Sequence, residues 1–268
     1  MVKELTFGYS PCPNDTFMFN AIASGAVQVA GCCLKPVLQD VETLNQLAMS
    51  ATLDISKLSF YAWMALKDRY RLLDSGTAMG SGCGPVLIAR RPFNPRARDR
   101  CRVVLPGRWT TAHLLFRLWA PEVRRRVFVP YDRVFETLTT GRADCGVIIH
   151  ESRFTFQEAG FIALVDLGAW WEEKTGLPIP LGGIAARKNL GEPLLTRIET
   201  AVEQSIRQAM ANPAQTLPYV RRYAQEMDET VLQAHIGAFV NDFSLKRGAR
   251  GRRAVDTLET MARAAGAL

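Results

Sequence analysis

The sequence predicts an α/β protein made of two lobes with a cleft between them, and three observations indicate this fold. Strand-like and helix-like segments alternate over residues 5–90 and again over residues 103–187, as in sheets covered by helices. Between them lies the polar segment 91–102, which holds two prolines and five arginines and is typical of a crossing between lobes. From Glu192 to the end the pattern is helical.

The elements of the first half follow from apolar runs and from the turn residues between them. Asn14 or Asp15 is expected to cap a first helix that runs to about Ser24 and stops at Gly25. The glycine-rich segment 75–85 is typical of a loop. We expect strands at 5–9, 27–39, 53–58, 70–74 and 86–90, and further helices at 41–49 and 60–67.

The second half repeats this order after the crossing. We expect strands at 103–105, 127–130, 145–149, 162–167 and 178–187, and helices at 112–119, 134–139, 154–159 and 168–175. The tail is expected to form helices at 194–211, 214–225, 228–241 and 252–264. Lobe 1 would then comprise residues 1–90 plus 188–268, and lobe 2 residues 91–187. The alternative is one continuous doubly wound sheet.

The two halves also resemble each other in how one strand ends. Asp54 precedes an apolar strand that ends in Lys57-Leu58-Ser59, and Asp144 precedes a strand that ends in His150-Glu151-Ser152. Because α/β proteins bind ligands at the carboxyl ends of their strands, both ends should face the cleft. The pattern therefore predicts a hinge-bending architecture of the periplasmic-binding-protein type, with C-terminal helices on the first lobe.

Composition and charge indicate a globular protein with a small-molecule partner. The chain of 268 residues is 48% hydrophobic and 22% charged, which is enough for a sizeable core. Its net charge of +7 comes from scattered basic clusters without a nucleic-acid recognition motif, so we expect a basic surface that attracts a small anion. No apolar run reaches the roughly 18 residues of a membrane span, so no membrane insertion is expected.

The cysteines and the start of the chain point to a cytoplasmic protein. The six cysteines form no CxxC pair, and most of them lie in apolar runs where a free thiol behaves as a small hydrophobe. The chain enters its first strand without an apolar signal stretch. We therefore expect reduced thiols and a cytoplasmic location.

His150 is the first candidate for chemistry. It stands at the carboxyl end of the apolar run 145–149, where the chain passes into the next helix. An imidazole in such a place can accept a proton near neutral pH. The structural alternative is a histidine that only caps the helix or closes the edge of the core.

Two loops of the first half should face the same cleft. In Ser10 to Thr16 two prolines stiffen a helix start whose free N–H groups can hold an anion, so Asn14 and Asp15 are candidate binding residues. A capping turn would explain Asp15 equally well. Lys57 and Ser59 place an ammonium and a hydroxyl at a strand end, although such a lysine often covers apolar surface with its stem.

The loop Pro106 to Ala112 supplies a third set of donors. Gly107 allows close backbone approach, and the paired Thr110 and Thr111 offer hydroxyls and N–H groups to a carboxylate or phosphate. The phosphate-loop and GxGxxG patterns do not occur, nor do HExxH, Cys/His ligand spacing or a GxSxG elbow. The sequence therefore shows no metal site, and proton abstraction by one imidazole beside hydrogen-bond donors is the reaction these residues support.

Several motifs of the sequence resemble one family. They are Ser10-Pro-Cys-Pro-Asn-Asp-Thr-Phe17, Lys57-Leu-Ser59, Gly82-Cys-Gly-Pro85, Pro106-Gly-Arg-Trp-Thr-Thr-Ala112 and Gly146-Val-Ile-Ile-His-Glu-Ser-Arg-Phe-Thr-Phe156. Over about the first 190 residues the chain resembles 1,4-dihydroxy-6-naphthoate synthase, a lyase of the futalosine route to menaquinone. The SPCPNDTF and HExRFT motifs are specific, whereas the helical tail adds little.

The resemblance implies a fold, a reaction and site residues. The fold is that of type II periplasmic binding proteins, the substrate is cyclic dehypoxanthine futalosine, which carries a carboxylate, and no cofactor is expected. The proton acceptor falls on His150, and substrate contacts fall on Lys57, Leu58 and Ser59 and on Thr110 and Thr111.

Two alternatives share this architecture. Chorismate dehydratase is a lyase of similar fold in the same pathway, but the segment His150 to Phe156 argues against it. A non-catalytic solute-binding protein for a small anion should carry an export signal, and this chain starts at its first strand.

Overall fold

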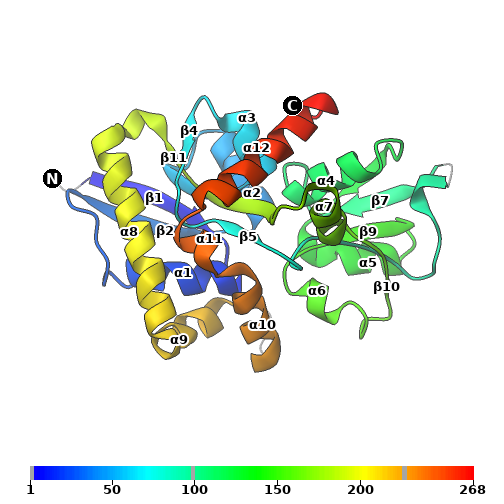
Figure 1. Cartoon of the computed structure of the whole chain (residues 1–268). Coiled ribbons are helices and arrows are strands. Elements are labelled where there is room, and N and C mark those ends of the chain that lie inside the picture. The colour runs from blue at the N-terminus through cyan, green and yellow to red at the C-terminus, as the bar shows by residue number, and fades with distance from the viewer. Residues whose placement is uncertain (1–2, 98–99, 225–227) are drawn as a thin grey trace.

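The computed structural model describes residues 3–97, 100–224 and 228–268 and has two lobes, each built around one β-sheet. Figure 1 shows the six-stranded sheet with α1 and α8 on the left and the five-stranded sheet with α4 to α7 on the right. The two-lobed α/β architecture predicted from the alternation of strands and helices is confirmed. The single continuous sheet, the alternative, is excluded.

The six-stranded sheet has the order β2-β1-β3-β11-β4, with β5 paired to β11. Its strands are β1 (Lys3–Tyr9), β2 (Cys32–Leu38), β3 (Ile55–Ser59), β4 (Tyr70–Leu72), β5 (Ala78–Gly80) and β11 (Ile179–Arg187). The helices α1 (Pro13–Ala23), α2 (Val41–Met49) and α3 (Phe60–Leu66) connect its early strands. β1 is parallel to β2 and β3, so the chain passes from β1 through α1 and from β3 into α3 at the same edge of the sheet.

The five-stranded sheet has the order β10-β6-β9-β7-β8. Its strands are β6 (Val86–Ala89), β7 (Arg102–Leu105), β8 (Arg125–Phe128), β9 (Cys145–Ile148) and β10 (Ile162–Asp166). Its helices are α4 (Thr111–Trp119), α5 (Val134–Thr139), α6 (Ser152–Thr155) and α7 (Leu167–Thr175). β7 is parallel to β9, so α4 and the loop after β9 both begin at one edge of this sheet.

The tail returns to the first lobe, as predicted. Its helices are α8 (Glu192–Ala211), α9 (Pro213–Tyr223), α10 (Glu229–Phe239), α11 (Asp242–Leu245) and α12 (Gly248–Ala264). Helices α8, α9 and α10 pack on α1, and α12 lies across the top of the molecule between the lobes (Figure 1). The predicted end of one tail helix at residue 225 lies outside the described residues.

Two sequence expectations change at the crossings. The strand at 86–90 was expected to close lobe 1, but β6 pairs with β9 and β10 in the second sheet. The strand at 178–187 was expected to return across the boundary and was counted with lobe 2, and β11 pairs antiparallel with β3, β4 and β5 in the first sheet. Apolar runs in both sheets look alike, so strand pairing decides where each crossing falls. The loop expected at 75–85 likewise contains β5.

One of the hydrophobic clusters spans both lobes. A single cluster of buried side chains includes Leu58 and Phe60 of the first lobe and Leu87 and Val103 of the second. Apolar contact across the boundary stabilises the arrangement of the two lobes.

Candidate active site

A cavity between the lobes contains most of the residues expected to bind substrate. It encloses about 690 Å³ of empty space, part of which is open to solvent. Among the residues that line it are Ser10, Asn14, Asp15, Lys57, Ser59, Thr110, Thr111, His150 and Arg153.

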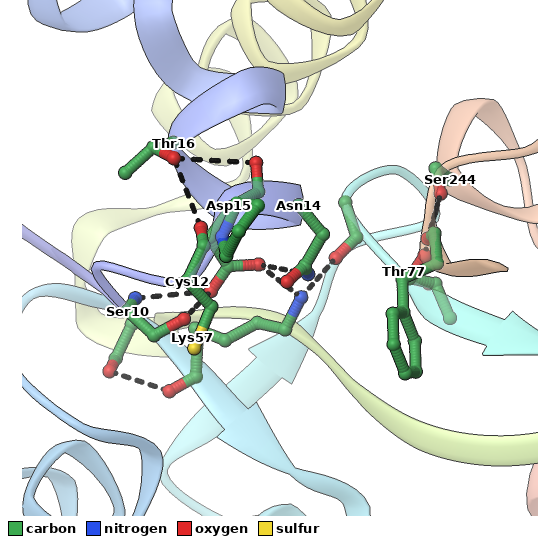
Figure 2. Close-up of polar contacts among 12 residues, drawn as sticks. Ser10, Cys12, Asn14, Asp15, Thr16, Lys57, Thr77 and Ser244 are labelled. Atoms are coloured by element: carbon green, nitrogen blue, oxygen red, sulfur yellow. Dashed lines mark hydrogen bonds and ion pairs between the residues drawn. The ribbon is translucent and has the colours of Figure 1, made fainter. Parts of the chain in front are cut away.

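Asp15 and Lys57 form the polar centre of the first-lobe wall, as Figure 2 shows. Lys57 Nζ donates to Asp15 Oδ1 at 2.9 Å, and the two side chains are 6% and 1% exposed. The remaining capacity of the Asp15 carboxylate is filled by the N–H and hydroxyl of Ser10 at 3.0 and 2.8 Å and by Asn14 Nδ2 at 2.9 Å. Every partner of this buried pair is therefore supplied by the protein.

The expectation that Asn14 or Asp15 caps the first helix was wrong. The N-cap of α1 is Cys12, whose side chain makes no capping hydrogen bond, and Pro13 occupies the first helical position. Proline suits that position because its missing N–H has no partner in a first turn. Asp15 therefore lies inside the helix, free to pair with Lys57 from β3.

Ser59 and Leu58 occupy opposite faces of β3. Ser59 lines the cavity, where its hydroxyl accepts from Asn45 Nδ2 at 3.1 Å and its N–H donates to Asn45 Oδ1 at 3.0 Å. Leu58 is not among the lining residues, because side chains alternate along a strand, and it packs in the shared core. The structure therefore corrects Leu58 from a substrate contact to a core residue.

Thr110 and Thr111 begin α4 on the second-lobe wall. The Thr110 hydroxyl caps the helix by accepting from the N–H of His113 at 3.2 Å. The Thr111 hydroxyl donates across the cleft to the carbonyl of Leu181 on β11 at 2.6 Å. Gly107, at φ +110°, approaches closely as predicted, but its neighbour is the Glu42 side chain rather than a ligand.

His150 enters the cleft from the loop after β9. Its φ of +57° is left-handed, a conformation that costs a non-glycine residue about 1–3 kcal/mol and that gathers at functional sites. Nδ1 lies 3.6 Å from Cys12 Sγ of the opposite lobe, and the ring meets Tyr131 edge-on at 5.0 Å. Nε2 is buried and has no hydrogen-bond partner among the described residues.

The surroundings of His150 set its protonation. Burial lowers its pKa, and the negative charges of Glu151 and Asp15 oppose that effect. The imidazole is therefore neutral, and able to accept a proton, over the physiological range. Burial also raises the pKa of the Cys12 thiol well above its usual value, so the sulfur beside His150 keeps its proton.

The sequence did not point to His235, which lies directly behind His150. It comes from α10 in the helical tail, is fully buried, and stacks on His150 with ring centroids 6.2 Å apart. Its Nε2 lies 3.0 Å from Asn14 Oδ1, and its Nδ1 lies 3.9 Å from Glu151 Oε2. A histidine on a tail helix gives no motif, and only the docking of α10 on α1 brings it here.

Hydrogen bonds join the two lobes beside the cleft. Both oxygens of Glu42, at the start of α2, accept N–H groups of the second lobe, from Arg108 and Trp109, at 2.9 Å each. Arg153 of α6 donates to the carbonyl of Gly84 and to Asp166, which fixes the loop that carries His150. Sequence patterns missed Glu42, since it looks like an ordinary surface charge on a helix, and they included Arg153 in the HExRFT motif without giving it a role.

Metal and membrane sites are not found in the part of the chain that the structure describes. No group of three or more His, Cys, Asp or Glu among residues 3–97, 100–224 and 228–268 is arranged to hold a metal ion. Nor does any helix in these ranges have the length and apolar character needed to cross a membrane.

Comparison with known proteins gives the family. A family model described as menaquinone biosynthesis matches residues 5–264. The chain is 46% identical to the 1,4-dihydroxy-6-naphthoate synthase of Thermus thermophilus, over 99% of this chain and 96% of that one. The chain belongs to the 1,4-dihydroxy-6-naphthoate synthase family. The enzyme of this name from Streptomyces coelicolor is 42% identical over 98% of this chain and 94% of its own.

Membership in the 1,4-dihydroxy-6-naphthoate synthase family confirms the resemblance and makes the chain a lyase of menaquinone biosynthesis. A structure from Archaeoglobus fulgidus matches with a TM-score of 0.93 and 32% identity, covering 99% of this chain and 98% of the other. An alkanesulfonate-binding protein from Xanthomonas axonopodis matches with a TM-score of 0.71 and 12% identity, covering 99% and 94%. The latter likeness confirms the periplasmic-binding-protein-like fold alone.

Proposed function

We propose that this chain converts cyclic dehypoxanthine futalosine to 1,4-dihydroxy-6-naphthoate, with His150 as the proton acceptor in the cleft between the lobes. The observation that carries the proposal is the position of His150. Its partly enclosed imidazole lines the same cavity as Ser59 of the first lobe and Thr111 of the second. The family supports the reaction, and the cavity supports the residue.

The substrate offers groups that match this cavity. Its aromatic carboxylate and sugar-derived hydroxyls would be held by Thr110 and Thr111 at the start of α4, where helix N–H groups favour an anion. Ser59 would orient the sugar-derived ring. Lys57, Asn14 and Asp15 would shape the wall, since Lys57 and Asp15 already neutralise each other. His150 would then remove the proton that starts carbon–carbon cleavage.

Replacing His150 by asparagine tests the base directly. General-base catalysis contributes about 10²–10⁴-fold, so His150→Asn should lower kcat by that factor. KM should change little, because the hydroxyls that hold the substrate remain. Release of the naphthoate followed by absorbance measures both, and His113→Asn, which alters a buried histidine on α4, is the matched control. Wild-type turnover in His150→Asn would remove the histidine from the mechanism.

The same assay separates the alternatives. A chorismate dehydratase would consume chorismate and leave cyclic dehypoxanthine futalosine untouched, and a binding protein would give no product with either. As further parts of the proposal, the partner is a carboxylate-bearing small molecule rather than nucleic acid, no cofactor takes part, and the enzyme works in the cytoplasm. Dialysis against a chelator before the assay should leave the rate unchanged.

A further inference from the structure

Behind His150 lies a group of buried polar atoms that the proposed reaction has not used. His150 Nε2, Glu151 Oε2 and His235 Nδ1 are each buried, and none has a hydrogen-bond partner among the described residues. They belong to neighbouring side chains, since the two rings stack and Nδ1 of His235 lies 3.9 Å from Glu151 Oε2. Buried polar atoms are almost always paired, so three unpaired ones together call for an explanation.

The hydrogen bonds around Asn14 fix which nitrogen of His235 carries a proton. Asn14 Nδ2 donates to the Asp15 carboxylate at 2.9 Å, so Asn14 Oδ1 is the atom that faces His235 Nε2 at 3.0 Å. Nε2 must therefore donate, and in a neutral ring Nδ1 is then an acceptor. Burial lowers the pKa of His235 to about 3, which keeps the ring neutral.

Two acceptors consequently face each other without a donor between them. One is Nδ1 of His235 and the other is Glu151 Oε2, and both lie beside His150. A protonated imidazole has a donor on each nitrogen, and Nδ1 of His150 already meets Cys12 Sγ at 3.6 Å. When His150 accepts a proton, its positive charge lies near the Glu151 carboxylate, whose Oε2 no donor among the described residues pairs.

We propose that Glu151 and His235 are positioning residues that stabilise His150 in its proton-bearing form. Glu151 supplies the opposite charge, and His235, held by Asn14, supplies a neutral ring that stacks on His150 and fixes its orientation. This inference rests on the proposed role of His150 as the base. It makes the cleft complementary to the state formed after proton transfer, where stabilisation accelerates the reaction.

The charges around His150 support this assignment. Burial lowers its pKa, and Glu151 is the largest influence that raises it. The other titratable groups that face the ring come from every element packed on it, namely Cys12, Asp15, Asp40, Lys57, Tyr131 and His235. Of these, Asp15 is already paired with Lys57, whereas Glu151 Oε2 has no donor among the residues that the structure describes.

A titration of the histidine side chains tests the proposal without relying on catalysis. The chain has only three histidines, so isotope-labelled imidazoles can be assigned by NMR with His113→Asn and His235→Asn. In Glu151→Gln the pKa of His150 should fall by about one pH unit or more, because a nearby carboxylate raises a histidine pKa by that order. Glu136→Gln, which alters an exposed glutamate on α5, should leave it unchanged.

Steady-state kinetics give a second test of the role of Glu151. In Glu151→Gln kcat should fall on the order of ten-fold with KM nearly unchanged, and the acidic limb of kcat/KM should move to lower pH. Glu151→Asp should restore part of the rate. If the pKa of His150 and the acidic limb of the kcat/KM pH profile were both unchanged in Glu151→Gln, this inference would be overturned, while His150 would remain the base. Full activity of His150→Asn would overturn the proposed function itself, whatever the titration gives.

Discussion

The two walls of the cleft differ in whether their buried polar groups have hydrogen-bond partners. On the first lobe Asp15 and Lys57 form a closed network in which Ser10 and Asn14 complete the carboxylate's hydrogen bonds. On the second lobe the residues after β9 leave His150 Nε2 and Glu151 Oε2 without partners among the described residues. Lys57 lies near the end of β3 and His150 follows β9, yet only the hydrogen bonds around Lys57 and Asp15 are complete.

The difference indicates that the completed network stabilises the fold, whereas the incomplete group takes part in the proposed reaction. A completed buried ion pair holds three elements together, here α1, β3 and the loop between β1 and α1, and has little left to offer a substrate. An incomplete group is unfavourable in the resting protein and becomes favourable when a proton arrives. Residues of similar type at equivalent strand ends therefore serve different purposes, and the hydrogen-bond inventory distinguishes them.

The largest expected effect on stability comes from breaking the completed network. Lys57→Met leaves the Asp15 carboxylate buried without its counter-charge and should lower the free energy of unfolding by about 3–5 kcal/mol. Glu151→Gln, on the incomplete wall, should change it by less than about 1 kcal/mol. Urea unfolding followed by tryptophan fluorescence measures both.

A double variant sharpens that comparison. Combining Lys57→Met with Asp15→Asn removes both charges, so part of the lost stability should return, because neutral groups cost less to bury than an unpaired carboxylate. If Lys57→Met proved as stable as Glu151→Gln, the two walls would not differ in the way described.

The next effect is on the pH dependence of stability. Burial lowers the pKa of His235 to about 3 and that of His113 to about 4, both from an ordinary 6.5. Between pH 6.5 and 4 these two histidines are therefore mostly protonated in the unfolded chain and mostly neutral in the folded protein. Stability should be full above pH 6.5 and should fall with acid by about 1.4 kcal/mol per pH unit for each histidine.

Single replacements show whether these histidines cause the slope. His235→Asn and His113→Asn should each remove about 1.4 kcal/mol per pH unit from the dependence between pH 6 and 4.5, although each also lowers stability by a constant amount through its lost hydrogen bond. A slope that stays the same in both variants would assign the acid sensitivity to carboxyl groups instead.

The smallest expected effect concerns the helix start that faces the substrate. Thr110→Ala removes the N-cap of α4 and should lower the free energy of unfolding by about 1 kcal/mol, whereas Thr110→Ser keeps the hydroxyl and should lose little. KM should rise in Thr110→Ala and stay near the wild-type value in Thr110→Ser. Equal stability of the two variants would show that the cap contributes nothing measurable.

Local patterns predicted the elements well. Helices α2 and α5 begin and end at the residues expected, and β7 and β9 each lie within one residue of their predicted bounds. The reason is that apolar periodicity and turn residues act over a few positions, and the chain shows them directly. The first helix began one to two residues earlier than its expected cap, because Pro13 rather than a polar side chain starts it.

Pairings between distant segments were beyond local patterns. The sheet to which β6 and β11 belong, the core position of Leu58 and the arrival of His235 behind His150 all depend on which surfaces meet. Gly107 illustrates the same point, since its predicted close contact is with Glu42 of the other lobe.

The sequence by itself determined the α/β alternation, the strand ends that meet at the cleft, the family, and the candidate residues His150, Ser59, Thr110 and Thr111. The tertiary structure decided that Lys57 is neutralised by Asp15 and that Glu151 and His235 accompany the imidazole. The physical reason is that residue types and their spacing can be read directly from the sequence. Burial, ion pairing and the resulting protonation states arise only when segments that are distant in the sequence pack together and exclude water.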